Sequence, residues 1–175
     1  FLGRAKSAGL NVPKRSFDRA ISWLKRKYVS VEVDDAELSV RTYALYLLAR
    51  AGQVNPGDVR YLQDTSLDEM NLEDQAQLGA AMMMSGEVAR SQSLFTNITL
   101  ANEAWDPDSY STPIRDGAMR LTRMAEARVD AETLLKIGQK LSSLVHSKRW
   151  LSTQEMSWLV LAAKALMDAQ DPVFV

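Results

Sequence analysis

The feature that most constrains the fold is an alternation between two kinds of helical apolar pattern. In the segment 14–28, residues such as Phe17 and Ile21 form one apolar side and charged residues fill the other, which predicts a helix with one solvent-exposed face. The segment 35–51 is apolar in nearly every direction and predicts a buried helix. The two patterns continue to alternate along the chain, and residues 29–33 are the one candidate for a strand. The sequence therefore predicts an all-α fold.

The buried kind of helix returns at intervals that indicate a repeat architecture. The expected inner helices begin near Asp35, Asp68, Thr112 and Ser152, in steps of 33, 44 and 40 residues. A period between about 20 and 50 residues is typical of stacked helical hairpins. Inner helices that are apolar on all sides favour a closed or curled barrel of helices over an open solenoid. We therefore expect four helical hairpins in such a barrel.

The helix boundaries carry recognisable capping signals. Ser66–Glu69 and Ser152–Glu155 both have the Ser-x-x-Glu order of a capping box. Thr112 precedes a proline, which supplies an N-cap followed by the residue best suited to the first helical position. Asp130 is expected to cap the helix that follows it, and Gly52 is expected to end the helix before it. These signals place the ends of most predicted helices.

Composition describes an ordinary globular domain and excludes several classes of protein. The chain has 175 residues, of which 46% are apolar, and contains no cysteine, so disulfides, thiolate metal sites and cysteine nucleophiles are absent. No apolar stretch approaches the ~20 residues that a membrane span needs. The net charge is −1, yet residues 1–33 hold eight Lys/Arg against two acids and residues 34–74 hold three against nine. These two blocks are expected to face each other or solvent.

The residues with catalytic or metal-binding chemistry have structural explanations that are stronger. His146, the single histidine, lies at the end of an amphipathic helix, where a cation is favourable without any further role. Paired acids could perform acid–base chemistry or bind Mg²⁺, but most of them lie at helix starts, where carboxylates complement the helix dipole. The pairs are Asp34 with Asp35, Asp68 with Glu69, Glu73 with Asp74, and Asp106 with Asp108.

Two further clusters admit both a binding and a structural interpretation. The basic stretch from Lys14 to Lys27, with Trp23 and Tyr28 among the cations, could bind phosphates or single-stranded nucleic acid, but a solvated outer helix face is favoured. Met82–Met84 could form an adaptable binding surface, although core filling is favoured on an all-round apolar helix. No phosphate loop, nucleophile elbow or metal-ligand spacing is present. We therefore predict no catalytic, cofactor-binding or metal-binding residue, no cofactor and no nucleic acid partner.

Three segments in register resemble one known family. They are VRTYALYLLARAG at 40–52, YSTPIRDGA at 110–118 and STQEMSW at 152–158. All three are similar to the thioester-domain region of bacterial alpha-2-macroglobulins, and the similarity extends in the same order along the whole chain. The Ser-Thr-Gln start of the last segment is also similar to animal alpha-2-macroglobulins and to thioester-containing complement components.

The resemblance implies a specific fold and role. Residues 1–175 would form a single partial domain, the C-terminal portion of a thioester domain built as an α/α toroid of about six hairpins, so the toroid would be incomplete here, with about four hairpins present. The parent would be a non-enzymatic protease-trapping inhibitor, periplasmic and anchored to the inner membrane as a lipoprotein. Its partners would be proteases and the other domains of its own chain. The family's thioester joins the Cys and Gln of a Cys-x-Glu-Gln motif, and this chain has no cysteine, so no reactive residue is assigned here.

Gln154 is not a candidate for that glutamine, because the thioester glutamine needs a cysteine three residues before it. The chain opens on Phe1 and Leu2 without a methionine or signal peptide, and we interpret it as an excised fragment. A truncated toroid would expose apolar flanks at both ends and form a homodimer through them. Two other classes remain open: a toroid enzyme, such as a terpene cyclase or glycosidase with acids lining its cavity, and a helical-repeat interaction module.

Overall fold

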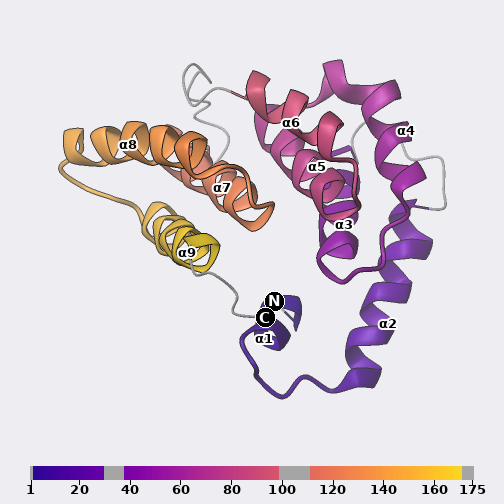
Figure 1. The fold of residues 1–175 in the computed structure, drawn as a ribbon. Coiled ribbons are helices and arrows are strands. Elements are labelled where there is room, and N and C mark those ends of the chain that lie inside the picture. The colour runs from indigo at the N-terminus through magenta and orange to yellow at the C-terminus, as the bar shows by residue number, and fades with distance from the viewer. Residues whose placement is uncertain (1, 30–37, 99–110, 171–175) are drawn as a thin grey trace. The chain divides into compact units, whose positions relative to one another are not determined.

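The structure is a computed structural model that describes residues 2–29, 38–98 and 111–170 (Figure 1). Within these ranges every regular element is a helix, so the all-α prediction is confirmed. The elements are α1 (Leu2–Ser7), α2 (Lys14–Leu24), the π-helical turn η1 (Lys25–Val29), α3 (Leu38–Arg50), α4 (Pro56–Ser66), the 3₁₀ turn η3 (Leu67–Glu69), α5 (Leu72–Met84), α6 (Val88–Asn97), α7 (Pro113–Glu126), α8 (Ala131–Ser147) and α9 (Thr153–Gln170).

The chain divides into two compact units, Phe1–Ser91 and Gln92–Val175. Each unit has its own packed centre, and each is described by itself. The incomplete α/α toroid and the single partial domain over residues 1–175 therefore stay predictions. None of the described helices combines the length and the apolar character that a bilayer span requires.

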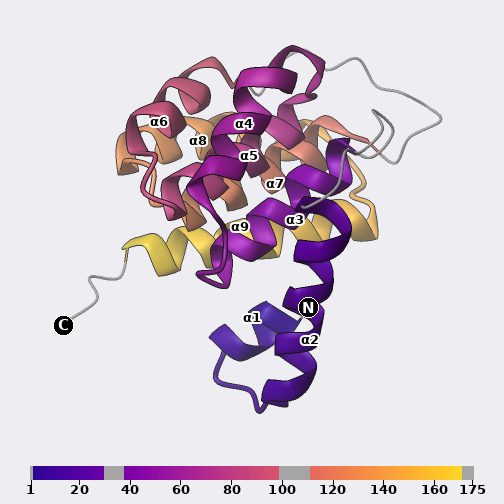
Figure 2. The ribbon, with the colours of Figure 1, turned by 90° about the vertical axis from the view of Figure 1, so that its right-hand side faces the viewer.

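The first unit is built around α3 and α5, which pack side by side (Figure 1). Leu45 and Leu48 of α3 and Leu78 and Met82 of α5 are all at most 1% exposed. Helix α4 contacts α5, and α2 has no buried residue, which is the behaviour expected of an outer helix. Figure 2 shows α1 turning back toward α2. The prediction that the α3 and α5 segments form an inner layer is confirmed within this unit.

The second unit is built around α7, which packs against both α8 and α9. Every residue of α7 from Asp116 to Ala125 is buried, so α7 is an inner helix as predicted. Helix α8 buries only the stripe of Leu134 and Leu141. The core of this unit is therefore centred on α7.

The prediction that the last helix is buried on all sides is wrong. Within α9 only Glu155, Ala162 and Ala165 are buried among the described side chains, and Leu161 is half-buried. Val160 and Met167 are each 68% exposed. Helix α9 packs chiefly on α7, so one side of it is covered and the opposite apolar side faces solvent. An all-round apolar sequence does not by itself supply a neighbour for every side of a helix.

The predicted start of the second inner helix near Asp68 is also wrong. Ser66 ends α4 and makes no side-chain cap, so the expected Ser66–Glu69 capping box does not form. Helix α5 begins at Leu72, because Asn71 Oδ1 accepts a 2.9 Å hydrogen bond from the Asp74 N–H. Asn is as good an N-cap as Ser, and here it lies next to the apolar run that must be buried.

Other boundaries agree with the prediction or lie partly outside the described residues. Gly52 adopts a positive φ of 66° after α3, and its N–H bonds the Ala49 carbonyl at 2.9 Å, as a helix-ending glycine should. Thr112 and Asp130 cap α7 and α8 through the N–H groups of Arg115 and Thr133. The expected helix over 14–28 is α-helical to Leu24 and continues as the π turn η1. The predicted start at Asp35 and most of the strand candidate 29–33 lie outside the described residues.

Candidate functional site: buried carboxylates at the starts of the inner helices

In the second unit, the Glu155 carboxylate accepts bonds from three other residues. It is 2% exposed and lies in the first turn of α9. The Ser152 N–H donates to Glu155 Oε2 at 2.7 Å, and the Glu155 N–H donates to Ser152 Oγ at 3.2 Å. These two reciprocal bonds form the predicted capping box. The local sequence signal is therefore confirmed in full.

Two donors from outside the capping box also reach Glu155. The Thr112 hydroxyl donates to Oε1 at 2.8 Å, and Lys148 Nζ lies 2.9 Å from the same oxygen. Burial by itself would raise the pKa of Glu155. The Ser152 N–H, the Lys148 ammonium and the Thr112 hydroxyl outweigh burial and lower the pKa to about 2. Glu155 is therefore a fixed anion that joins the start of α7, the loop after α8 and the start of α9.

The start of α7 is organised by a second buried acid. Asp116 is 3% exposed, and its Oδ1 accepts a 2.6 Å bond from Arg115 Nε. The Ser111 hydroxyl donates to the other carboxylate oxygen, Oδ2. Thr112 uses its hydroxyl twice, because Oγ1 accepts the Arg115 N–H at 3.1 Å and donates to Glu155. The N-cap of α7 and the capping box of α9 are thus parts of one hydrogen-bond network.

The first unit repeats this arrangement between α3 and α5. Asp74, in the first turn of α5, is 3% exposed and accepts hydroxyl bonds from Ser39 at 2.7 Å and Thr42 at 3.1 Å. Both hydroxyls belong to the beginning of α3. Burial raises the pKa of Asp74, and the two hydroxyl bonds offset only part of that effect. In both units an acid from the first turn of one inner helix therefore binds a hydroxyl at the start of the preceding inner helix.

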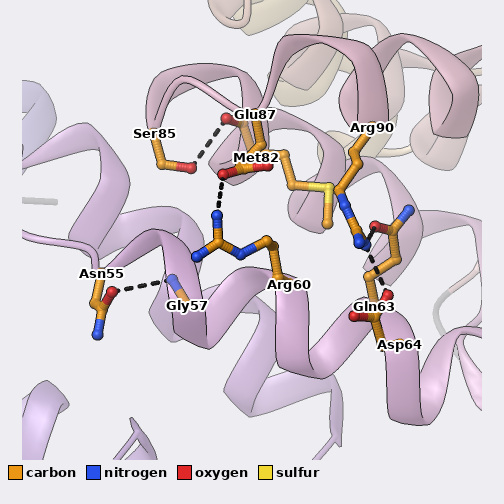
Figure 3. Close-up of polar contacts among 9 residues, drawn as sticks. All are labelled: Asn55, Gly57, Arg60, Gln63, Asp64, Met82, Ser85, Glu87 and Arg90. Carbon is orange, nitrogen blue, oxygen red and sulfur yellow. Dashed lines mark hydrogen bonds and ion pairs between the residues drawn. The ribbon is translucent and has the colours of Figure 1, made fainter.

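Ion pairs connect the outer helix α4 to the turn between α5 and α6 and to the beginning of α6 (Figure 3). Arg60 Nη1 lies 2.7 Å from Glu87 Oε1, and Arg90 Nη1 lies 2.6 Å from Asp64 Oδ1. The hydrogen bond and charge of Asp64 raise the pKa of Arg90. These pairs are largely exposed, so they orient the helices and add little stability. The buried carboxylates above are the stronger connections.

The remaining residues singled out from the sequence occupy ordinary structural positions. His146 is exposed in the last turn of α8, with Nδ1 2.8 Å from the Ser142 carbonyl oxygen. Asp68 and Glu69 are exposed on η3, whereas Asp34, Asp35, Asp106 and Asp108 lie outside the described residues. Met82 is fully buried, which agrees with core filling, and Met83 and Met84 are half-buried. The basic stretch lies on exposed parts of α2 and η1.

The hydrogen bonds of the buried carboxylates hold neighbouring helices together at their starts. Among the described residues no group of three or more His, Cys, Asp or Glu side chains could hold a metal ion. Glu155 already accepts an N–H, a hydroxyl and an ammonium, and it stays ionised across the pH range in which general acids work. Sequence reasoning found the capping box but missed the bonds that Thr112 and Lys148 make to Glu155, because both partners come from other elements and no local spacing identifies these contacts.

In comparisons with known proteins, the chain matches bacterial alpha-2-macroglobulins. No family model matches it. The alpha-2-macroglobulin of Escherichia coli strain K12 is 28% identical over 182 residues, which cover 96% of this chain and 11% of that protein. The chain thus spans about a tenth of the length of this curated relative.

Solved structures of bacterial relatives have the same fold. The native conformation of Escherichia coli alpha-2-macroglobulin matches 95% of this chain and 11% of its own, with a TM-score of 0.77 and 25% identity. Salmonella alpha-2-macroglobulin reacted with methylamine matches 93% of this chain and 11% of its own, with a TM-score of 0.75 and 26% identity. In sequence and in fold, the chain is therefore similar to one segment of the bacterial alpha-2-macroglobulins.

Proposed function

We propose that this chain is part of a bacterial alpha-2-macroglobulin-like protease trap, in which it forms helical scaffold for the domain that carries the thioester. The observation that carries the proposal is the collinear match over 96% of the chain. Structures of the Escherichia coli relative are known in forms activated by trypsin and by porcine elastase. Proteases are therefore the partners that we propose for the parent of this chain.

The scaffold role is supported by what the buried side chains do. Glu155 and Asp74 accept hydrogen bonds from residues at the starts of helices, and these bonds hold the helices in place. Glu155 also stays ionised, so it has no proton to transfer. We assign no catalytic residue to the chain and propose that it is not an enzyme. The reactive cysteine and glutamine would be supplied by another part of the parent, which we propose to be a periplasmic lipoprotein.

A toroid enzyme with acids lining a cavity gains no support from the described residues. The two buried acids whose pKa values are shifted lie in different units, and each is engaged by hydroxyl donors. A cavity acid that works on a substrate needs acceptor capacity or a proton left for it. In a scaffold, these acids need neither a free acceptor atom nor a proton for a substrate, so the same observations agree with the scaffold proposal.

Protease trapping can be tested on the parent protein that contains this chain. The parent is incubated with trypsin, and hydrolysis of a small peptide substrate is compared with hydrolysis of a large protein. A trap leaves trypsin active on the peptide and shields it from the protein, because only small molecules reach an enclosed active site. Equal inhibition of both substrates, or inhibition of neither, would overturn the proposal.

The scaffold role has a separate readout in the same protein. Methylamine treatment of the parent should release one thiol, since a thioester is cleaved by a primary amine. Glu155→Ala in the parent should weaken trapping and make thiol release faster or spontaneous, because α7 and α9 lose their shared anchor. Unchanged trapping and thiol release in this variant, with the helices loosened, would show that the chain is not scaffold for the thioester.

A further inference from the structure

The outer face formed by α2 and the first residues of η1 is mainly cationic, with Asp18 and Ser22 among its basic residues. Lys14, Arg15, Arg19 and Arg26 lie on one side of the helix axis, and Trp23, 51% exposed, lies at the edge of that side next to Arg19. We call these five residues the α2 cationic face. They take part in lining a shallow hollow whose described lining residues all belong to α2 and the first turn of η1. The apolar residues of α2 point the opposite way, toward the rest of the unit.

Within the described residues of this region, basic side chains outnumber acidic ones. Residues 2–29 hold eight Lys/Arg and a single acid, Asp18. Lys14 pairs with Asp18 at 2.5 Å in an exposed contact. Within the described part of the chain, Arg15, Arg19 and Arg26 form no ion pair. A patch of this kind attracts an anionic surface even though the whole chain has a net charge of −1.

The π turn η1 holds Trp23 in place at the edge of the face. The Trp23 and Tyr28 rings meet edge to face, with centroids 5.5 Å apart and an interplanar angle of 81°. Residues five positions apart lie roughly 140° apart around a regular α-helix, so the wider π turn brings these two rings together. Lys25 Nζ donates to Gln53 Oε1 at 3.2 Å and attaches the turn to the loop after α3. Trp23 is therefore a fixed aromatic group beside unpaired arginines.

The shape of the face selects among anionic partners. A hollow bounded by one helix has no opposing wall, so it does not enclose a small molecule. One exposed aromatic ring provides no row of stacking positions for successive bases of a single-stranded nucleic acid. A planar array of phosphate headgroups fits an open helix face that carries cations and has a tryptophan at its edge, the residue types that favour the membrane interface.

We propose that the α2 cationic face binds the surface of a bilayer that contains anionic phospholipid, with Arg15, Arg19 and Arg26 against the phosphates and Trp23 at headgroup level. This role goes beyond protease trapping and does not depend on it. The binding is electrostatic and peripheral, because the apolar side of α2 stays turned toward its own unit. It should therefore weaken as salt screens the charges.

The test is co-sedimentation of the 175-residue chain with vesicles. One set of vesicles is neutral phosphatidylcholine, and the other contains phosphatidylglycerol as well. We expect binding to the anionic vesicles only, a blue shift of tryptophan fluorescence that Trp23→Phe removes, and roughly tenfold weaker binding for the double variant Arg19→Gln/Arg26→Gln. The matched control is Lys140→Gln/Arg149→Gln, which removes the same amount of charge from exposed positions elsewhere. This variant should bind anionic vesicles as tightly as the unsubstituted chain does.

Three results would overturn the proposal. Equal loss of binding in the control double variant would mean that net charge alone drives the association. Equal binding to neutral vesicles would mean that exposed apolar side chains such as Leu10 are responsible. Binding of a single-stranded oligonucleotide without binding of anionic vesicles would assign the face to nucleic acid instead. Circular dichroism of each variant establishes that a lost interaction is not a lost fold.

Discussion

The Thr112 hydroxyl donates a 2.8 Å hydrogen bond to Glu155 Oε1 across 43 residues of sequence. Thr112 is the N-cap of α7, and Glu155 is the capping-box acid of α9, so one bond connects the exact points at which two packed helices begin. Thr42 and Asp74 form the corresponding bond between α3 and α5. The same kind of bond is thus present in both units, and its contribution to stability can be measured.

Thr112→Ala removes both functions of that hydroxyl. We expect a loss of about 2 kcal/mol in the free energy of unfolding, of which about 1 is the N-cap and the remainder the donor lost from a buried carboxylate. Thr112→Ser is the matched control, since its hydroxyl can make both bonds and the loss should be small. Urea denaturation followed by circular dichroism measures the difference. Equal stability of the alanine and serine variants would mean that the bond to Glu155 contributes nothing.

Ser152→Ala tests the local half of the network. The Glu155 N–H loses its 3.2 Å acceptor, and the expected cost is about 1 kcal/mol, the usual size of an N-cap loss. Ser143→Ala, on the exposed side of α8, serves as the control and should leave the unfolding midpoint nearly unchanged. If Ser152→Ala unfolds at the same urea concentration as the unsubstituted chain, the capping box is not a stabilising element of α9.

Glu155 and Asp74 predict opposite dependences of stability on pH. Glu155 has a folded-state pKa of about 2, below its ordinary value of 4.5, so its contribution is present above pH 4.5 and is lost as pH falls toward 2. Asp74 has a raised folded-state pKa, so its protonated form favours the folded state below the ordinary value of 3.8, and this contribution is lost as pH rises through the folded-state pKa.

Neutral amide variants separate the two effects. Glu155→Gln should lower stability at pH 7 and flatten the decline between pH 4.5 and 2. Asp74→Asn should cost much less at pH 7, because it removes a buried charge that desolvation disfavours while keeping one acceptor oxygen. Unfolding midpoints measured across this pH range decide the matter. A steeper acid decline in Glu155→Gln than in the parent chain would contradict the assigned sign.

The sequence predicts the capping residues well and the surroundings of helices less well. Thr112, Asp130 and the Ser152–Glu155 box act as predicted because capping depends on residues within one turn of each other. The Ser66–Glu69 motif fails because Asn71 offers an equally good cap nearer the apolar run, and tertiary packing chooses between them. Helix α9 is less buried than its composition suggests, since a neighbour for each side is a property of the assembly of helices.

Two kinds of glycine allow a paired test of backbone conformation. Gly52 has a φ of 66°, and a side chain there would be strained although space around it is open. We expect Gly52→Ala to lower stability by about 1 kcal/mol. Gly138 lies inside α8 with nothing within 4 Å of an added Cβ, so Gly138→Ala should raise stability by roughly 0.5–1 kcal/mol. Thermal unfolding of the two variants should therefore shift in opposite directions, and a shift in the same direction would contradict this account.

Helix α9 carries an exposed apolar stripe that should drive self-association of the isolated chain. Met156, Val160 and Met167 are 48%, 68% and 68% exposed and recur at helical spacing on one side. Contiguous apolar surface of this kind is uncommon on soluble monomers, and a second copy supplies an identical stripe to cover it. We expect sedimentation velocity to show a dimer at micromolar concentration and a monomer for Val160→Lys/Met167→Lys, because a charge placed on each copy of the stripe repels its counterpart.

The control is Lys136→Gln/Lys140→Gln, which replaces two exposed lysines of α8 and should leave the dimer intact. If the unsubstituted 175-residue chain stays monomeric and binds no hydrophobic dye, the stripe does not drive association.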